Sequence, residues 1–187
     1  MFQRHAFLAC ASMLAVTLTF SATAFAQEES TPKYEIGVGY SGLHTNSADS
    51  TLQRTGNGGA GYFEYNLNRT LGLVGDFGGY ANTNTHDRLM TYMFGPRFNW
   101  RRGRLTPYAQ FLFGGAYLWG GSTYSQTQNA FATAAGGGVD YRLTDHIAIK
   151  PFQVEYLMTQ LNSTNGFGSH QNGVRYSAGV VFRLGSK

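Results

Sequence analysis

Large apolar residues alternate with small or polar residues along most of the chain beyond residue 30. In the stretch 90–100, for example, Met90, Tyr92 and Phe94 alternate with Thr91, Met93 and Gly95. The same alternation recurs in the segments 34–41, 61–67, 71–78, 109–119, 131–142 and 174–183. A period of two places neighbouring side chains on opposite faces of a β-strand. These segments therefore predict seven strands, each with one apolar face.

An eighth strand is predicted between Ile147 and Met158, although the alternation changes phase in its middle. Pro151 lies at this change, and proline inside a sheet is confined to edges and bulges. We therefore predict a β-bulge at this proline, because an extra residue restores a common apolar face and turns Lys150 to the other side. The apolar face is then formed by Ile147, Ile149, Phe152, Val154 and Tyr156.

Composition indicates which solvent these apolar faces meet. Charged residues make up 13% of the chain, aromatic residues 15%, and there are 25 glycines. Soluble domains carry about 25% charged residues, so this surface suits another solvent. A mean hydropathy of −0.25 also excludes a bundle of membrane helices. Lipid-facing and lumen-facing residues alternate and cancel in a transmembrane barrel. We therefore predict an all-β fold, a single eight-stranded antiparallel up-and-down transmembrane β-barrel.

The connections between the predicted strands alternate in length. The short ones are 68–70, 101–106 and 143–146, and the longer, polar ones are 45–57, 82–87, 120–129 and 159–172. Transmembrane barrels have short periplasmic turns and longer outer loops, which orients the chain. The arginines of the turn 101–106 are the only basic cluster, and a polar turn at a membrane surface accounts for them better than a nucleic-acid partner.

In this orientation the aromatic residues form two belts around an aliphatic band, as expected where rings sit at headgroup level. A soluble ligand-binding barrel of the lipocalin kind, with its apolar residues inside, is the alternative that these belts oppose. The periplasmic belt is predicted to contain Tyr34, Phe63, Tyr65, Phe98, Trp100, Tyr108, Tyr141 and Phe182, and the outer belt Tyr40, Tyr92, Tyr117, Trp119, Phe131, Tyr156 and Tyr176.

The first 26 residues have the pattern of a signal peptide. A basic start at Arg4 is followed by an apolar run over 6–20, and Ala24-Phe25-Ala26 supplies a small-x-small cleavage site. We predict cleavage between Ala26 and Gln27, which leaves a barrel domain over 27–187.

A group of polar residues is predicted to point into the barrel from neighbouring strands. A buried ion-pair network that fills the lumen is the favoured interpretation, because buried charges persist when they are paired. A narrow gated pore lined by charge is the second interpretation. The predicted network contains Glu64, Asp76, Arg97, Gln110, Asp140 and Arg142.

Catalytic, metal and cofactor sites are not expected. The histidines at 44, 86, 146 and 170 lack the close pairing that zinc sites use. Ser163, Ser169 and His170 share one predicted loop that follows Glu155, but their spacing does not require the geometry of a hydrolase triad.

Three segments carry a resemblance to a known family: Phe94–Asn99, Thr106–Gly115 and Gly136–Leu143. With them the chain resembles the outer-membrane β-barrel superfamily typified by the OmpA-like transmembrane domain, particularly its short, barrel-only members. The segment Gly179–Leu184 is similar to the insertion signal read by the outer-membrane assembly machinery.

The resemblance implies a cell outer membrane location, with outer-membrane lipids and the assembly machinery as partners. It also implies a structural, membrane-integrity or surface-interaction role through the outer loops. A small porin-like diffusion channel is the alternative, and a lipid-modifying enzyme is a third, less favoured one.

Overall fold

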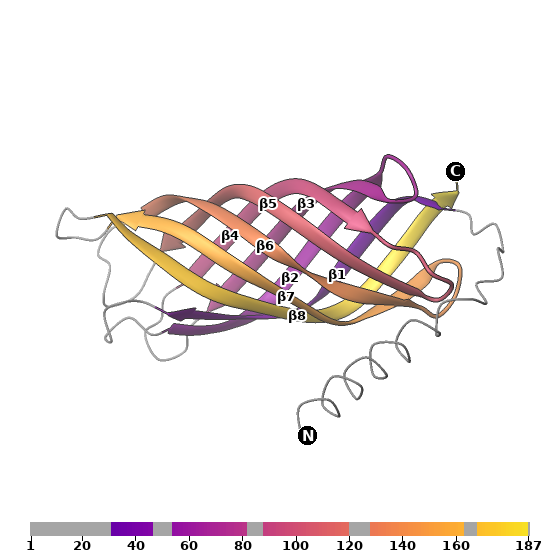
Figure 1. Cartoon of the computed structure of the whole chain (residues 1–187). Coiled ribbons are helices and arrows are strands. Elements are labelled where there is room, and N and C mark those ends of the chain that lie inside the picture. Colours follow the sequence, from indigo (N-terminus) through magenta and orange to yellow (C-terminus); the bar gives the residue numbers. More distant parts are fainter. Residues whose placement is uncertain (1–30, 47–53, 82–87, 120–127, 163–167, 187) are drawn as a thin grey trace, which may run out of the picture.

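Eight antiparallel strands close into one barrel in the computed structural model, which describes residues 31–46, 54–81, 88–119, 128–162 and 168–186 (Figure 1). The predicted signal peptide and its cleavage site lie outside the described residues. The strands are β1 Pro32–Asn46, β2 Arg54–Asn66, β3 Leu71–Ala81, β4 Arg88–Asn99, β5 Leu105–Trp119, β6 Gln128–Arg142, β7 Ile147–Asn162 and β8 Gly168–Ser186.

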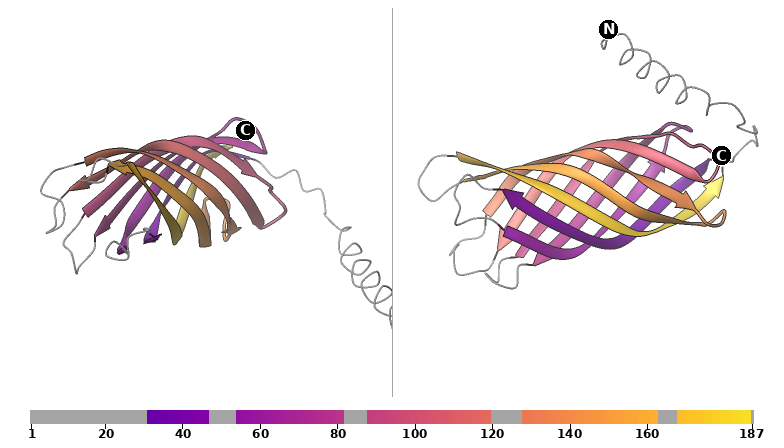
Figure 2. Two further views of the ribbon diagram at one scale, coloured as in Figure 1. Left: turned by 60° about the vertical axis from the view of Figure 1, so that its left-hand side comes forward. Right: turned by 60° about the horizontal axis from the view of Figure 1, so that its bottom comes forward.

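Each strand pairs with its neighbours in the sequence, and β1 pairs with β8 to close the sheet. The closing seam runs from Pro32 opposite Ser186 to Asn46 opposite Asn172. The strands tilt strongly around the barrel axis (Figure 2). Among the described residues, no helix has the length and apolar character needed to cross a membrane. The predicted fold class is therefore confirmed, because closure leaves no strand edge unpaired.

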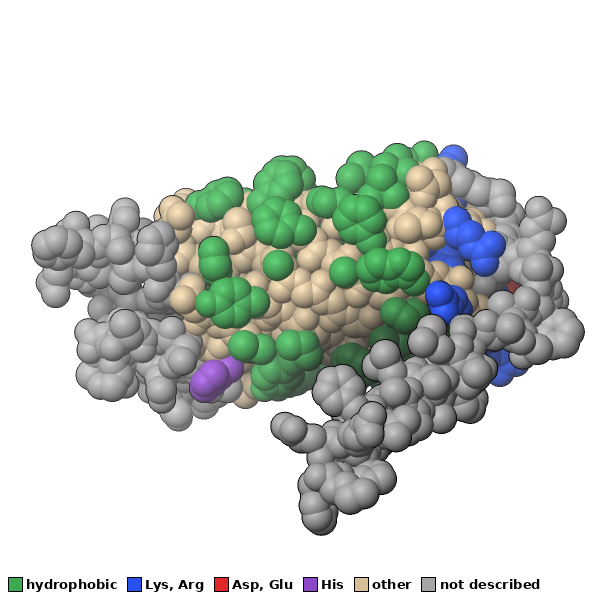
Figure 3. All heavy atoms as spheres, in the orientation of Figure 1, with side chains coloured by type: hydrophobic (Ala, Val, Ile, Leu, Met, Phe, Trp, Pro, Cys, Tyr) green, Lys and Arg blue, Asp and Glu red, His purple; other side chains and the backbone are tan. Residues whose placement is uncertain are grey.

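The outer wall of the barrel is apolar, as the alternation predicts. Val38, Phe94 and Phe111 in the middle of their strands are more than half exposed. Figure 3 shows hydrophobic side chains spread along this wall. The lipocalin-like alternative is wrong, because it requires these residues to point inward.

The β-bulge lies where the sequence predicts it. The register between β7 and β8 shifts between Lys150 and Gln153, on either side of Pro151. Phe152 and Val154 are exposed on the wall, whereas Lys150 is buried in the interior. The bulge thus allows one strand to keep its apolar face outward through a change of phase.

Two predictions are wrong: the bounds of the longer loops and the position of Tyr108. Strand pairing continues into the predicted loops, with Thr45 opposite Arg54 and Asn162 opposite Gly168. Backbone pairing can proceed without apolar alternation, so polar strand ends resemble loops in sequence. Tyr108 is only 3% exposed and lies inside the barrel rather than in the periplasmic belt.

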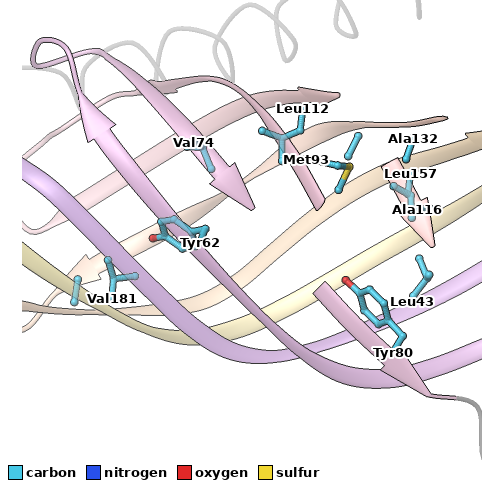
Figure 4. Packing of buried hydrophobic residues seen from close by; sticks show 12 residues of the cluster. Leu43, Tyr62, Val74, Tyr80, Met93, Leu112, Ala116, Ala132, Leu157 and Val181 are labelled. Atoms are coloured by element: carbon cyan, nitrogen blue, oxygen red, sulfur yellow. The ribbon is translucent and has the colours of Figure 1, made fainter. Parts of the chain in front are cut away.

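Apolar side chains fill the interior toward the end that carries the longer connections. Figure 4 shows part of this cluster, with Leu43, Tyr80, Ala116, Ala132 and Leu157 pointing into the barrel. These residues occupy the halves of their strands farthest from the short turns. The other half of the interior, which also holds Val74, Ala148 and Val181, contains most of the buried charged side chains, and the candidate site lies there.

Candidate functional site

The polar half of the interior contains equal numbers of buried acidic and basic side chains among the described residues. Since charges leave water at a high free-energy cost, this balance indicates a network of compensating pairs. The acids are Glu35, Glu64, Asp76, Asp140 and Glu155, and the bases are Arg97, Arg101, Lys150, Arg175 and Arg183.

Arg97 of β4 lies at the centre of the network. Its Nη1 donates to Glu64 Oε2 at 2.9 Å, and its Nε donates to Gln110 Oε1 at 2.7 Å. Its guanidinium carbon lies 4.3 Å from the ring centroids of both Tyr62 and Tyr108. Two rings and two polar partners therefore hold one cation across β2, β4 and β5, with cation–π attraction added to the ion pair.

Arg175 of β8 bridges two carboxylates on the side nearer the apolar half. Its Nη1 donates to Asp76 Oδ1 at 2.6 Å, and its Nε donates to Glu155 Oε2 at 2.6 Å. Glu155 also accepts from Gln110 at 2.6 Å and from Gln153 at 2.7 Å. This cluster joins β3, β5, β7 and β8 across the lumen.

Arg101 closes the network at the short-turn end. It follows β4, and its Nη2 donates to Glu35 Oε1 at 2.8 Å and to Asn66 Oδ1 at 2.9 Å. Its Nη1 donates to the carbonyl oxygen of Arg69 at 2.5 Å. The expectation that this arginine belongs to a solvated turn is therefore wrong, because its side chain folds back under the barrel.

These contacts form one continuous chain of hydrogen bonds through the lumen. It runs from Asp76 through Arg175, Glu155, Gln110, Arg97, Glu64, Asn99, Asn66 and Arg101 to Glu35. Glu64 is 0% exposed, and Arg97, Glu155 and Arg175 are each 1% exposed. These side chains at the centre of the barrel therefore present almost no surface to solvent.

The backbone makes room for these side chains at two glycines. A Cβ at Gly37 would lie 2.0 Å from the ring of Tyr62, and one at Gly72 would lie 2.2 Å from Glu64 Oε1. Larger residues at either position would overlap the network side chains. Glycine at these inner positions therefore permits a filled lumen in a narrow barrel.

The six residues predicted for the interior differ in their contacts. Glu64, Arg97 and Gln110 lie in direct contact, and Asp76 joins them through Arg175. The carboxylate of Asp76 is paired with Arg175, and the β3–β4 register places Met93 opposite Asp76.

The chain of hydrogen bonds traced above does not pass through Asp140 or Arg142. Asp140 is buried, but its Oδ1 has no hydrogen-bond partner among the described residues. Arg142 is half-buried near the short turns, with Ala148 opposite it. A register shift between Val139 and Tyr141 displaces this end of β6 relative to β7, so the predicted convergence of all six residues is incomplete.

Lys150 joins the network through the bulge. Its Nζ donates to Gln153 Oε1 at 2.7 Å and lies 3.9 Å from the centroid of the Tyr62 ring. Tyr108 donates to the same Gln153 oxygen at 2.7 Å. Gln153 thus couples the buried lysine to Glu155, a role that the alternation alone does not indicate.

The residues considered for other chemistry do not assemble in the described part of the chain. No three His, Cys, Asp or Glu side chains there are grouped to hold a metal ion. Glu155 lies inside the barrel in contact with Arg175, whereas Ser169 and His170 are at the far end of β8. Ser163 and His86 lie outside the described residues.

A closed antiparallel barrel with an apolar wall and a paired polar interior defines the class of transmembrane β-barrels. A model of the outer membrane protein β-barrel domain matches residues 12–182, and the chain belongs to this family. It is an outer-membrane β-barrel protein. A comparison with curated protein sequences finds no match.

Solved structures show the same fold at low sequence identity. Neisserial surface protein A is 18% identical with a TM-score of 0.61, and the match covers 81% of this chain and 97% of that one. OprG from Pseudomonas aeruginosa is 11% identical with a TM-score of 0.59, covering 84% and 98%. Ail, the attachment invasion locus protein of Yersinia pestis, is 17% identical with a TM-score of 0.50, covering 81% and 99%.

Proposed function

We propose that this protein is a non-conducting outer-membrane barrel that supports membrane integrity and makes surface contacts through its outer end. The closed polar network is the observation that carries the proposal. A water-filled pore requires a continuous solvated path, whereas Arg97 and Arg175 bridge the lumen with almost no exposed surface. The filled lumen therefore argues against a diffusion channel.

The outer end extends well beyond the lipid-facing wall. In β7, four residues follow Met158, the last apolar residue exposed on the wall among the described side chains of this strand, to Asn162, which corresponds to about 13 Å of strand. These residues pair with β8 through Gln160 opposite His170. A paired, polar rim of this length is suited to hold outer loops above the headgroups, where they meet ligands or other cells.

One structural neighbour provides an analogy for such contacts. Ail is described as an attachment invasion locus protein and was solved in complex with the heparin analogue sucrose octasulfate. A surface role for the present chain is consistent with this example. The identity of its own partner follows from its loops rather than from the shared fold.

Single-channel recording in planar lipid bilayers tests the proposal. The refolded wild-type protein is expected to give no stable conductance steps. The double variant Tyr62→Ala/Arg97→Ala removes two side chains of the plug and is expected to produce leakage. Phe94→Ala, on the same strand but on the outer wall, is the control and should remain silent. Reproducible steps from the wild-type protein would contradict the proposal and favour a channel.

A further inference from the structure

Exposed basic side chains gather at the end of the barrel that carries the short turns. Arg69 lies in the β2–β3 turn, and Arg102 and Arg104 lie in the β4–β5 turn; all three are exposed. Lys33, at the start of β1, is half-buried and lies 5.4 Å from the ring centroid of Tyr34. We call these four residues the basic rim. Figure 3 shows Lys and Arg side chains collected at this end of the molecule.

The rim is attached to a rigid part of the structure. Arg101 donates to the carbonyl oxygen of Arg69 at 2.5 Å and is itself bound to Glu35 inside the barrel. The amide of Asn99 also donates to the carbonyl oxygen of Thr70 at 2.6 Å. These contacts join the β2–β3 turn to the chain that leads into the β4–β5 turn. The exposed arginines are therefore held as neighbours along one arc of the rim.

Acidic side chains do not neutralise the basic rim within the described residues. Of the carboxylates at this end of the interior, Glu35 is paired with Arg101 and Asp140 is buried. No salt bridge of the described residues includes Arg69, Arg102 or Arg104, and the exposed acid of the short turns is Asp145, between β6 and β7. The excess positive charge thus faces outward.

The basic rim also lies at the depth of lipid headgroups. Trp100 is 50% exposed on the wall and precedes the β4–β5 turn. Phe98 of β4 and Phe182 of β8 are also exposed on the wall toward this end of the barrel. Exposed tryptophan and other aromatic residues at a strand end mark the boundary between hydrocarbon and headgroups. Cations just beyond that boundary are placed to meet phosphates while their aliphatic stems remain against apolar surface.

We propose that the basic rim binds the headgroups of anionic phospholipids in the leaflet that surrounds the short turns. Exposed lysines and arginines near an anionic leaflet attract its lipids, with an enrichment of about fivefold for each effective cation. The three arginines combine charge, exposure and headgroup depth, and Lys33 adds a half-buried cation beside Tyr34. All four residues lie at the opposite end from the proposed surface contacts. The protein thereby gathers anionic lipid around its base.

The two tryptophans of the chain, Trp100 and Trp119, allow a direct test because they lie at opposite rims. Trp119→Phe leaves a probe beside the basic rim, and Trp100→Phe leaves one at the other end. Each single-tryptophan protein is refolded into symmetric vesicles of phosphatidylcholine and phosphatidylglycerol. Bromine is placed on the acyl chains of one lipid or the other, and fluorescence quenching gives the local preference for each lipid.

Brominated phosphatidylglycerol is expected to quench Trp100 as if enriched at least about fivefold over phosphatidylcholine. The enrichment at Trp119, which has the single exposed Arg88 opposite it, should be smaller. Arg69→Gln/Arg102→Gln/Arg104→Gln should abolish the enrichment at Trp100, whereas Arg88→Gln at the other end should retain it. Raised salt should weaken it, since exposed charges are screened. Equal quenching by both lipids at Trp100, equal enrichment at both tryptophans, or enrichment that survives the triple substitution would each overturn the proposal. Conductance steps from the wild-type protein would refute the proposed function and leave these outcomes unchanged, so the two proposals fail independently.

Discussion

Replacing Arg97 with alanine removes the cation at the centre of the barrel and leaves Glu64 buried beside it. The change deletes the bond of 2.9 Å to Glu64 and the bond of 2.7 Å to Gln110, and it removes the cation from between Tyr62 and Tyr108. Breaking one side of a buried pair lowers the free energy of unfolding by about 3–5 kcal/mol. Because Asn99 still donates to Glu64 at 2.6 Å, we expect a loss of about 3 kcal/mol.

Arg88→Ala is the matched control on the same strand. Arg88 is exposed at the outer end of β4, and surface substitutions change stability by about 0.5 kcal/mol or less. Both variants and the wild type are unfolded with denaturant in detergent micelles, and tryptophan fluorescence follows the transition. Equal unfolding midpoints for the two variants would show that the cation at position 97 does not stabilise the barrel, and the inferred network would be refuted.

A double substitution separates the cost of an unpaired charge from the loss of packing. Arg97→Met/Glu64→Gln removes both charges while keeping side-chain volume in the lumen. Replacing a buried pair by uncharged groups is often neutral, so the double variant should be more stable than Arg97→Ala. If the stability lost by the double variant equals the sum of the losses of the single variants Arg97→Met and Glu64→Gln, the pair is not coupled.

Two further outcomes are expected. Gly72→Val should lower the unfolding free energy by about 1–3 kcal/mol in the same denaturant titration, because its Cβ would overlap a buried carboxylate. Gly75→Val is the control and should change the unfolding free energy little, because its Cβ would meet nothing within 4 Å. Proteinase K added to intact cells should cut within the connection between β7 and β8 and spare the β4–β5 turn, as measured by mass spectrometry. The reverse pattern would mean that the barrel has the inverted orientation.

The strands were predictable from sequence because alternation is a local property. Each residue needs only its neighbours to determine its face, so the phase of β4 and the bulge at Pro151 follow from the order of apolar side chains. Five of the six predicted interior residues are buried for the same reason. The length of polar strand ends was less predictable, because backbone pairing leaves no such pattern in sequence.

The partners inside the barrel required the three-dimensional register. Arg175 lies 99 positions from Asp76 in the sequence and meets it across the lumen. Arg101 was missed because its neighbours have the composition of a turn, although it continues the parity of Arg97 and Asn99. That parity was the available signal. Tyr108 was misplaced in a belt, although the alternation of Ala109 and Phe111 with their neighbours places it inside.

Two facing carboxylates in the β1–β2 pair explain why a turn arginine is drawn into the interior. Glu35 of β1 stands opposite Glu64 of β2, and like charges directly opposite each other are destabilising. Arg97 neutralises Glu64, and Arg101 neutralises Glu35, which also lies 3.9 Å from Arg183 of β8.

A slip of one residue between β1 and β8 would turn Glu35 toward the lipid and leave Arg183 and Arg101 without that partner inside. The buried charges therefore favour the native register in addition to filling the lumen. The same side chains that close the barrel to water also specify how its last strand meets its first.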